Sequence, residues 1–137
     1  MKRLTVAVCV DDRLGMMFNK RRQSRDSVLI DELIRSTSGR IFIHPYSSAL
    51  FANKERICIS ETPLSDAEGG DVCFIENMPL LPHLNDIETL IIYKWNRTYP
   101  FDMKLDIDTE LLGFNLISES EFEGSSHEKI TKGIYRR

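Results

Sequence analysis

The sequence predicts an α/β protein with a single open sheet, parallel in its front half and ending in an antiparallel C-terminal hairpin, in one domain spanning residues 1–137. Three observations predict this class. Leu4–Val10 is almost wholly apolar, which is typical of a strand covered on both faces in a parallel sheet. A helical pattern and a second apolar strand, Ile41–Ile43, follow it, and this order of elements forms a βαβ unit. Residues 114–118 and 129–135 flank a polar turn and are predicted to form the hairpin.

The helix of the βαβ unit is predicted from its cap and its periodicity. Ser24 or Asp26 can begin it by accepting backbone N–H groups, and Gly39 follows it as a natural stop. Between them, five apolar residues recur at helical spacing: Val28, Leu29, Ile30, Leu33 and Ile34.

The middle of the chain is predicted to contain only short elements. Ser47 or Ser48 can cap a short helix that runs through Phe51. Two prolines within residues 78–84 keep any helix there short. Three stretches are predicted as strands, and the last, which is the longest β-rich run, is expected to be central: residues 56–60, 72–76 and 90–95.

Composition excludes several classes of protein. The chain is 42% hydrophobic and 28% charged, which is ordinary for a globular domain and excludes disorder. Its net charge of -3 gives no overall field that would attract nucleic acid or an anionic membrane. No stretch approaches the roughly 18 apolar residues of a membrane helix. The first apolar run ends at two aspartates, so we interpret it as a strand and not as an export signal, and we expect a cytoplasmic protein.

The cysteines and histidines predict no metal site. Cys9, Cys58 and Cys73 lie within apolar runs without CxxC spacing, so we expect three buried, reduced thiols. The histidines are isolated in the sequence. His127 has Glu128 beside it, but neighbours on a strand face opposite sides and cannot act as a pair.

Three segments in the second half of the chain carry a resemblance to a known family. They read IETLIIYKWNRTYPFDMKLDID (residues 87–108), LLGFNLISESEF (residues 111–122) and EKITKGIYRR (residues 128–137). In order, spacing and strand character they resemble the closing strands of the dihydrofolate reductases. The opening TVAVCVDDRLGMMFN (residues 5–19) is similar to that family's first strand and mobile loop. The resemblance implies a shortened dihydrofolate reductase-like fold.

The departures from the family concern its cofactor. In the reductases, a strand that ends in a glycine pair, and the helix that follows it, hold the nicotinamide dinucleotide. Here only residues 77–86 separate Glu76 from the closing strands, so we expect one strand-helix unit to be missing. The family's phosphate-gripping G-R-x-T motif corresponds to HPYS (residues 44–47), which lacks the arginine and keeps only the hydroxyl of Ser47. We therefore predict that the protein uses no cofactor.

The missing unit leads to a prediction about strand order. In the family the strand that we expect to be lost lies in the middle of the sheet. Leu4–Val10 and residues 40–43 should therefore be direct parallel neighbours. Residues 90–95 should flank Leu4–Val10 on its other side, with residues 114–118 and 129–135 antiparallel beyond them.

Candidate ligand-binding residues gather at the start of the predicted helix. Arg21, Arg22 and Arg25 form a basic cluster with Lys20, and guanidinium groups beside free helix N–H groups can hold a phosphate or carboxylate. The alternative is a solvated loop. By the resemblance, Asp26 falls where the reductases carry their substrate carboxylate. It would act as a proton donor only if burial raised its pKa, whereas as an N-cap it needs nothing further.

Three further residues complete the candidate set. Asp12 lies at the carboxyl end of the first strand, where open α/β sheets bind ligands, although aspartate there also forms turns. Ser47 keeps the hydroxyl of the phosphate motif. The resemblance places Lys54 near the position of the arginine that clamps the folate tail.

The sequence supports two functional hypotheses. In the first, a non-catalytic protein with a dihydrofolate reductase-like fold binds a partner protein or a small anionic ligand, and a homo-oligomer is compatible with this. Membranes and nucleic acid are not expected as partners. In the second, a diverged reductase or another enzyme uses the pocket beside Asp26. An open cleft there, with Arg21 or Arg25 pointing into it, would favour the enzyme, and a filled cleft would exclude it.

Overall fold

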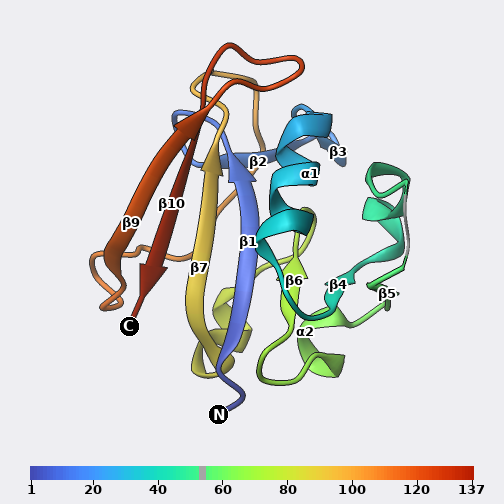
Figure 1. The fold of residues 1–137 in the computed structure, drawn as a ribbon. Coiled ribbons are helices and arrows are strands. Elements are labelled where there is room, and N and C mark those ends of the chain that lie inside the picture. Colours follow the sequence, from blue (N-terminus) through green and yellow to red (C-terminus); the bar gives the residue numbers. More distant parts are fainter. Residues whose placement is uncertain (53–54) are drawn as a thin grey trace.

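The structure is a computed structural model that describes residues 1–52 and 55–137. Its main feature is a seven-stranded sheet with the order β5-β4-β6-β1-β7-β10-β9 (Figure 1). In that order the strands are Ile57–Ile59, Ile41–Ile43, Val72–Phe74, Leu4–Val10, Ile87–Lys94, Ile130–Arg136 and Asn115–Phe122. From β5 to β7 neighbouring strands are parallel, whereas β10 runs antiparallel to both β7 and β9. The predicted fold class is therefore confirmed.

The strand order differs from the prediction in the middle of the sheet. β6 lies between β1 and β4 and pairs in parallel with both, so that Cys73 is opposite Val6 on one side and opposite Phe42 on the other. The expectation that Leu4–Val10 and residues 40–43 are direct neighbours is therefore wrong. All three residues of β6 are buried, because an apolar strand in this central position is covered on both faces.

The connection between β5 and β6 is short. Residues 60–71 join these strands and contain only one short helix, α2 (Pro63–Asp66). Ile75 and Glu76, and not a glycine pair, follow β6.

The closing part of the sheet agrees with the prediction. β7 flanks β1 along its whole length, and β10 and β9 follow as an antiparallel pair. β9 begins one residue later than the predicted strand at residues 114–118: Phe114 precedes it and is 4% exposed, whereas Leu116 is 49% exposed. β9 is exposed along nearly its whole length because it lies at the edge of the sheet.

Two layers cover the sheet. α1 (Ser27–Ser36) packs on one face, which is the near face in Figure 1, where Leu29 and Leu33 join Phe74 and Tyr93 in a buried cluster. The other face is covered by α2, by the 3₁₀ helix η2 (Leu81–Asp86) and by the segment between β7 and β9, which passes behind the sheet. The buried residues of this second layer include Leu64, Leu80, Leu105, Ile107 and Phe114.

The start of α1 confirms one of the two predicted caps. Asp26 is the N-cap, and its carboxylate accepts the backbone N–H groups of Val28 at 3.0 Å and Leu29 at 3.3 Å. The helix ends at Ser36, shortly before Gly39. No helix in the described part of the chain is long and apolar enough to cross a membrane.

The second predicted helix start is wrong. The 3₁₀ helix η1 (Pro45–Leu50) is capped by His44, whose Nδ1 accepts the N–H of Tyr46 at 3.0 Å, and not by Ser47 or Ser48. The helix begins earlier than predicted because Pro45 supplies a first residue whose φ is already suited to a helix.

A second sheet, which the sequence does not predict, consists of three short antiparallel strands. Its order is β3-β2-β8, formed by Arg21–Arg22, Gly15–Phe18 and Met103–Lys104. The N–H of Leu105 extends the pairing by donating to the carbonyl of Leu14 at 2.9 Å. The polar stretch before α1 is therefore held against the segment that follows β7.

The cysteines are all free. Cys73 is buried as expected, whereas Cys9 and Cys58 are only half-buried. Burial raises the pKa of the Cys73 thiol to about 12, and it also raises that of Cys9 well above its ordinary value. Because the thiolate is the reactive form, neither thiol is activated as a nucleophile.

The packing of α1 can be tested with Leu33→Ala. Leu33 is fully buried, so we expect the substitution to lower the free energy of unfolding by about 2–5 kcal/mol through lost burial and a residual cavity. Leu111→Ala is the matched control, since Leu111 is 82% exposed and should change stability by less than about 0.5 kcal/mol. Urea denaturation measures both variants, and equal losses would contradict this packing.

Candidate functional site

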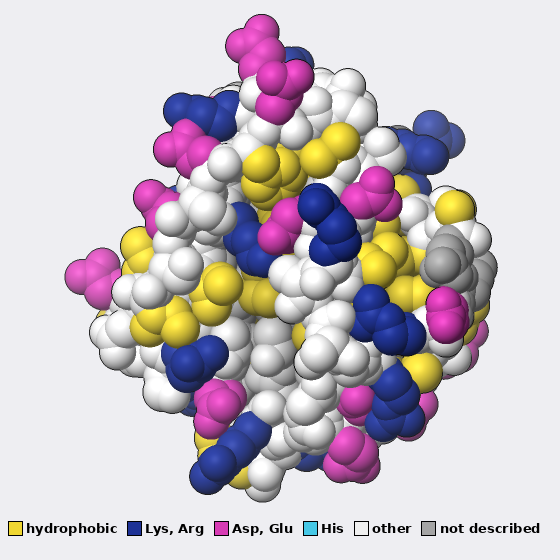
Figure 2. All heavy atoms as spheres, in the orientation of Figure 1, with side chains coloured by type: hydrophobic (Ala, Val, Ile, Leu, Met, Phe, Trp, Pro, Cys, Tyr) yellow, Lys and Arg dark blue, Asp and Glu magenta, His cyan; other side chains and the backbone are white. Residues whose placement is uncertain are grey.

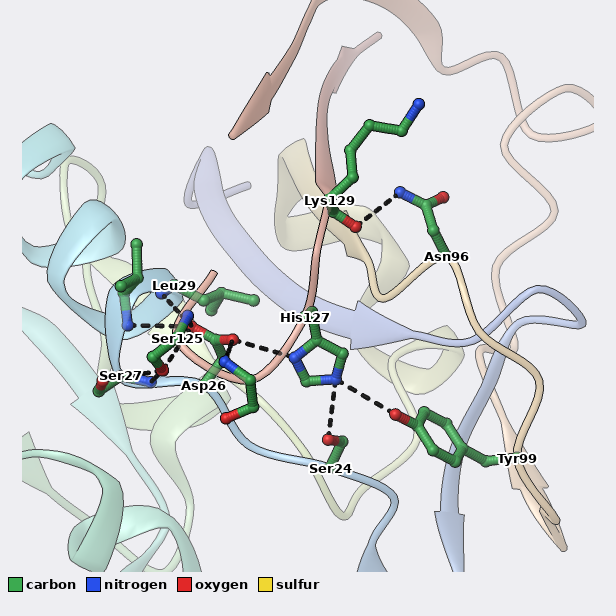
Figure 3. Close-up of polar contacts among 11 residues, drawn as sticks. Ser24, Asp26, Ser27, Leu29, Asn96, Tyr99, Ser125, His127 and Lys129 are labelled. Carbon is green, nitrogen blue, oxygen red and sulfur yellow. Dashed lines mark hydrogen bonds and ion pairs between the residues drawn. The ribbon is translucent and has the colours of Figure 1, made fainter. Parts of the chain in front are cut away.

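Asp26 and His127 meet between the start of α1 and the turn that precedes β10 (Figure 3). The Oδ2 atom of Asp26 lies 3.0 Å from Nδ1 of His127, and the two residues are 3% and 4% exposed. The same carboxylate accepts the backbone N–H groups of Ser125 at 2.9 Å and Ser126 at 2.8 Å. Together with the two N–H groups of α1, these donors surround the carboxylate on both sides.

The hydrogen bonds decide the charge of Asp26. Burial by itself would raise its pKa, but the bonds from His127 and from the backbone of Ser126, Ser125 and Leu29 outweigh burial and hold the pKa well below its ordinary value of 3.8. Asp26 is therefore an anion at neutral pH and cannot serve as the proton donor that the resemblance suggests. Its carboxylate anchors the last turn of the protein to the first helix.

The other ring nitrogen of His127 faces two hydroxyl groups. Nε2 lies 3.0 Å from the Oγ of Ser24 and 3.2 Å from the hydroxyl oxygen of Tyr99, and Trp95 stacks on the ring at a centroid distance of 4.5 Å. Because ionised Asp26 can only accept, Nδ1 carries the proton and Nε2 accepts from the hydroxyls. Hydroxyl, imidazole and carboxylate stand in the order of a serine hydrolase triad.

The space around Ser24 is too small for a substrate. The cavity that Ser24 borders with Asp26 and Trp95 has a volume of about 10 Å³. This is close to the minimum needed for one water molecule. Ser24 can therefore hold the imidazole in place, but the structure leaves no room for an ester or amide beside its hydroxyl.

Two of the predicted anion ligands, Arg22 and Ser47, meet around an internal carboxylate. The guanidinium of Arg22 donates to the carboxylate of Glu76 through Nε at 2.8 Å and through Nη2 at 3.0 Å. Ser47 donates its hydroxyl to the same carboxylate at 2.7 Å, and the Arg22 guanidinium lies 4.5 Å from the ring centre of Tyr46. Glu76 is 8% exposed, so it takes the position that a bound anion would need.

The remaining candidate residues are not gathered into one site. Arg21 is exposed on β3, and Arg25 borders a cavity of about 190 Å³ at the start of α1 together with Asp26 and Ser27. Neither arginine side chain has a partner among the residues that the structure describes. Asp12 is exposed and accepts the hydroxyl of Thr98 at 3.1 Å. Lys54 lies outside the described residues.

Asp11, and not its neighbour Asp12, organises the loop after β1. It is 1% exposed and accepts the N–H groups of Arg13 at 2.9 Å and Gly15 at 2.7 Å, and that of Tyr99 from the segment after β7 at 3.1 Å. Burial would raise the pKa of Asp11, but these hydrogen bonds lower it from its ordinary value. The Asp11-Asp12 pair alone does not reveal which of its members faces inward.

His127 and Glu76 are the important residues that sequence reasoning missed. The Asp26 partner of His127 lies 101 positions earlier in the chain, and no local pattern links them. Glu76 follows β6, and only its place at the end of a buried strand could have marked it as a candidate.

The comparison with solved structures agrees with the predicted fold. The chain is similar in structure to a dihydrofolate reductase from Enterococcus faecalis that was solved in complex with NADP(H) and RAB-propyl. The two superpose with a TM-score of 0.67 over 98% of this chain and 96% of that one, at 8% sequence identity. No family profile and no curated protein sequence matches this chain. The protein therefore has a dihydrofolate reductase-like fold, and the likeness is one of fold alone.

The Asp26 anchor can be tested with Asp26→Asn. Since folding lowers the pKa of Asp26, the carboxylate stabilises the protein above its ordinary pKa of 3.8, and this contribution is lost as the pH falls below that value. We expect the variant to lose about 1.5–3 kcal/mol of unfolding free energy near neutral pH, where the carboxylate is fully charged.

The difference between wild type and Asp26→Asn should shrink as the pH is lowered through the acid range, and urea denaturation at a series of pH values measures it. Asp12→Asn is the control, because Asp12 is exposed and its carboxylate accepts a hydrogen bond from the hydroxyl of Thr98. A difference that does not depend on pH would show that the charge of Asp26 has no part in the anchor.

Proposed function

We propose that this protein is a non-catalytic cytoplasmic protein that binds a small anionic ligand. The observation that carries the proposal is the lack of space for a substrate beside the hydroxyl of Ser24. Small-molecule sites usually enclose about 300–1,000 Å³, whereas the cavity between Ser24, Asp26 and Trp95 has a volume of about 10 Å³. Asp26 also borders a second cavity of about 190 Å³, which has Arg25 in its wall. Because this cavity too is smaller than the usual small-molecule site, the limited space beside Asp26 speaks against an enzyme that uses it.

The contacts of three candidate ligand residues, Arg22, Ser47 and Asp26, support the same proposal. Arg22 and Ser47 are occupied by Glu76, and Asp26 is occupied by His127 and the turn at residues 125–126. A phosphate could reach Arg22 only by displacing a buried carboxylate that forms two charge-assisted hydrogen bonds with it. Groups of the chain itself thus pair with the residues that the resemblance would assign to a cofactor and a substrate.

Arg21 and Arg25 support an anionic ligand. Both keep guanidinium groups without a partner among the described residues, and Arg25 borders a cavity together with the hydroxyl-bearing Ser27, Ser125 and Ser126. Figure 2 shows Lys and Arg side chains interspersed with Asp and Glu on the face that carries α1. Binding would therefore depend on these local arginines and not on an overall field.

Two other functions have one observation each in their favour. A partner protein is favoured by β9, an exposed edge strand on which Leu116 and Ile117 are about half exposed at 49% and 51%. An enzyme is favoured by the contact between Ser24 and His127, but the lack of space at Ser24 counts against it.

The absence of reductase activity is directly testable. A charge-assisted phosphate contact contributes roughly 1.5–3 kcal/mol, and losing two or three of them weakens binding by about 10³-fold or more. We therefore expect no NADPH binding at micromolar concentrations by calorimetry and no dihydrofolate reduction by absorbance. Turnover in the wild-type protein that disappears in Asp26→Asn would contradict the proposal.

The anion-binding part is tested with pyrophosphate as the probe. We expect pyrophosphate to raise the melting temperature of the wild-type protein and to have little effect on Arg21→Ala/Arg25→Ala, because the free guanidinium groups are removed. Arg35→Ala is the matched control, since Arg35 lies at the far end of α1. An equal shift in all three proteins would show that the arginine cluster is not the site.

A further inference from the structure

A large cavity lies on the side of the sheet opposite α1. Its volume is about 560 Å³, within the range of small-molecule sites, and it opens between the end of β7 and the segment that carries β8. Its apolar wall is formed by Leu14, Ile92, Leu105 and Ile107. Neither Asp26 nor the arginine cluster borders it.

Two lysines on the rim of this cavity have no partner. Lys94 ends β7 and Lys104 ends β8, and neither ammonium group forms an ion pair or hydrogen bond with a described residue. By contrast, Lys132 is paired with Glu32 at 2.8 Å, and Lys129 with Glu121 at 2.9 Å. The cavity therefore holds two positive charges that the chain leaves unsatisfied.

The acidic residues of the cavity are engaged with the backbone. Asp106 accepts the N–H groups of Leu80 and Leu81, one on each carboxylate oxygen and both at 2.9 Å. Asp108 accepts the N–H of Leu111 at 3.0 Å. These carboxylates stabilise the covering segment, and neither lies within ion-pair distance of Lys94 or Lys104.

Tyr135 adds a third donor. Its ring borders the cavity and leans over Gly133, where an added Cβ would lie only 2.9 Å from the ring carbon Cε1. Gly133 is paired with Ile92 across β10 and β7. The absence of a side chain at Gly133 leaves space for the Tyr135 ring on this face of the sheet. The Tyr135 hydroxyl has no hydrogen-bond partner among the residues described.

We propose that this cavity binds an organic anion with an apolar body, such as an aromatic or alkyl carboxylate or sulfonate. Its apolar part would lie against Ile92, Leu105 and Ile107, and its acid group would reach Lys94 and Lys104. An inorganic anion would leave the apolar wall exposed, and a neutral ligand would leave both ammonium groups unpaired. This site is independent of the arginines beside α1, so either proposal can fail without the other.

The probe is the dye anilinonaphthalene sulfonate, whose fluorescence rises in an apolar environment, with phenylnaphthylamine as its uncharged counterpart. We expect saturable binding of the sulfonate at one site per chain. Lys94→Ala/Lys104→Ala should weaken it roughly 100-fold, at about tenfold for each charged contact, and Tyr135→Phe should weaken it less. The uncharged dye should bind the wild type and Lys94→Ala/Lys104→Ala equally.

Two control variants separate this site from others. Lys129→Ala removes a lysine outside the cavity, and Arg21→Ala/Arg25→Ala removes the cluster beside α1, so both should bind the sulfonate like the wild type. Thermal melts confirm that each variant is folded. Wild-type affinity in the double lysine variant would overturn the inference, as would a failure of the folded wild type to bind the dye. Loss of binding only in Arg21→Ala/Arg25→Ala would overturn it too, while supporting the proposed anion site at α1.

Discussion

The carboxylate of Asp26 holds the first helix and the last strand of this protein together. It caps the N-terminus of α1 through two backbone N–H groups and receives four further donors from residues 125–127. A charge buried this deeply is stable only when such donors replace its lost water. The position of His127, and through it the contacts of Ser24 and Tyr99, follow from this one anion.

Glu76 is a second buried carboxylate near the carboxyl end of β1; it binds Arg22 and Ser47 and borders the same small cavity as Asp26. Open α/β sheets leave a crevice at this end of their strands, and ligands usually occupy it. Here two side-chain anions occupy it instead. The chain shares its fold with a dihydrofolate reductase, and at this end of the sheet both buried carboxylates are paired with groups of the chain itself.

Local patterns were enough to predict most elements but not their neighbours. Leu4–Val10 is apolar on both faces and Asp26 precedes a helical repeat, so the strand and the cap could be read directly from the sequence. Val72–Phe74 identifies a buried strand, but three residues cannot show which strands lie beside it. Likewise, nothing near His127 in the sequence indicates that its partner is Asp26, because only the completed sheet brings them together.

The place of β10 between β7 and β9 has a consequence for how the chain is made. During synthesis, β1 and β7 can pair before residues 130–136 exist, but the outer edge of β7 then has no partner. Contacts between such distant segments also form slowly, because a long loop must close first. The growing chain therefore carries an open strand edge on the ribosome, where it can pair wrongly, until its last strand emerges.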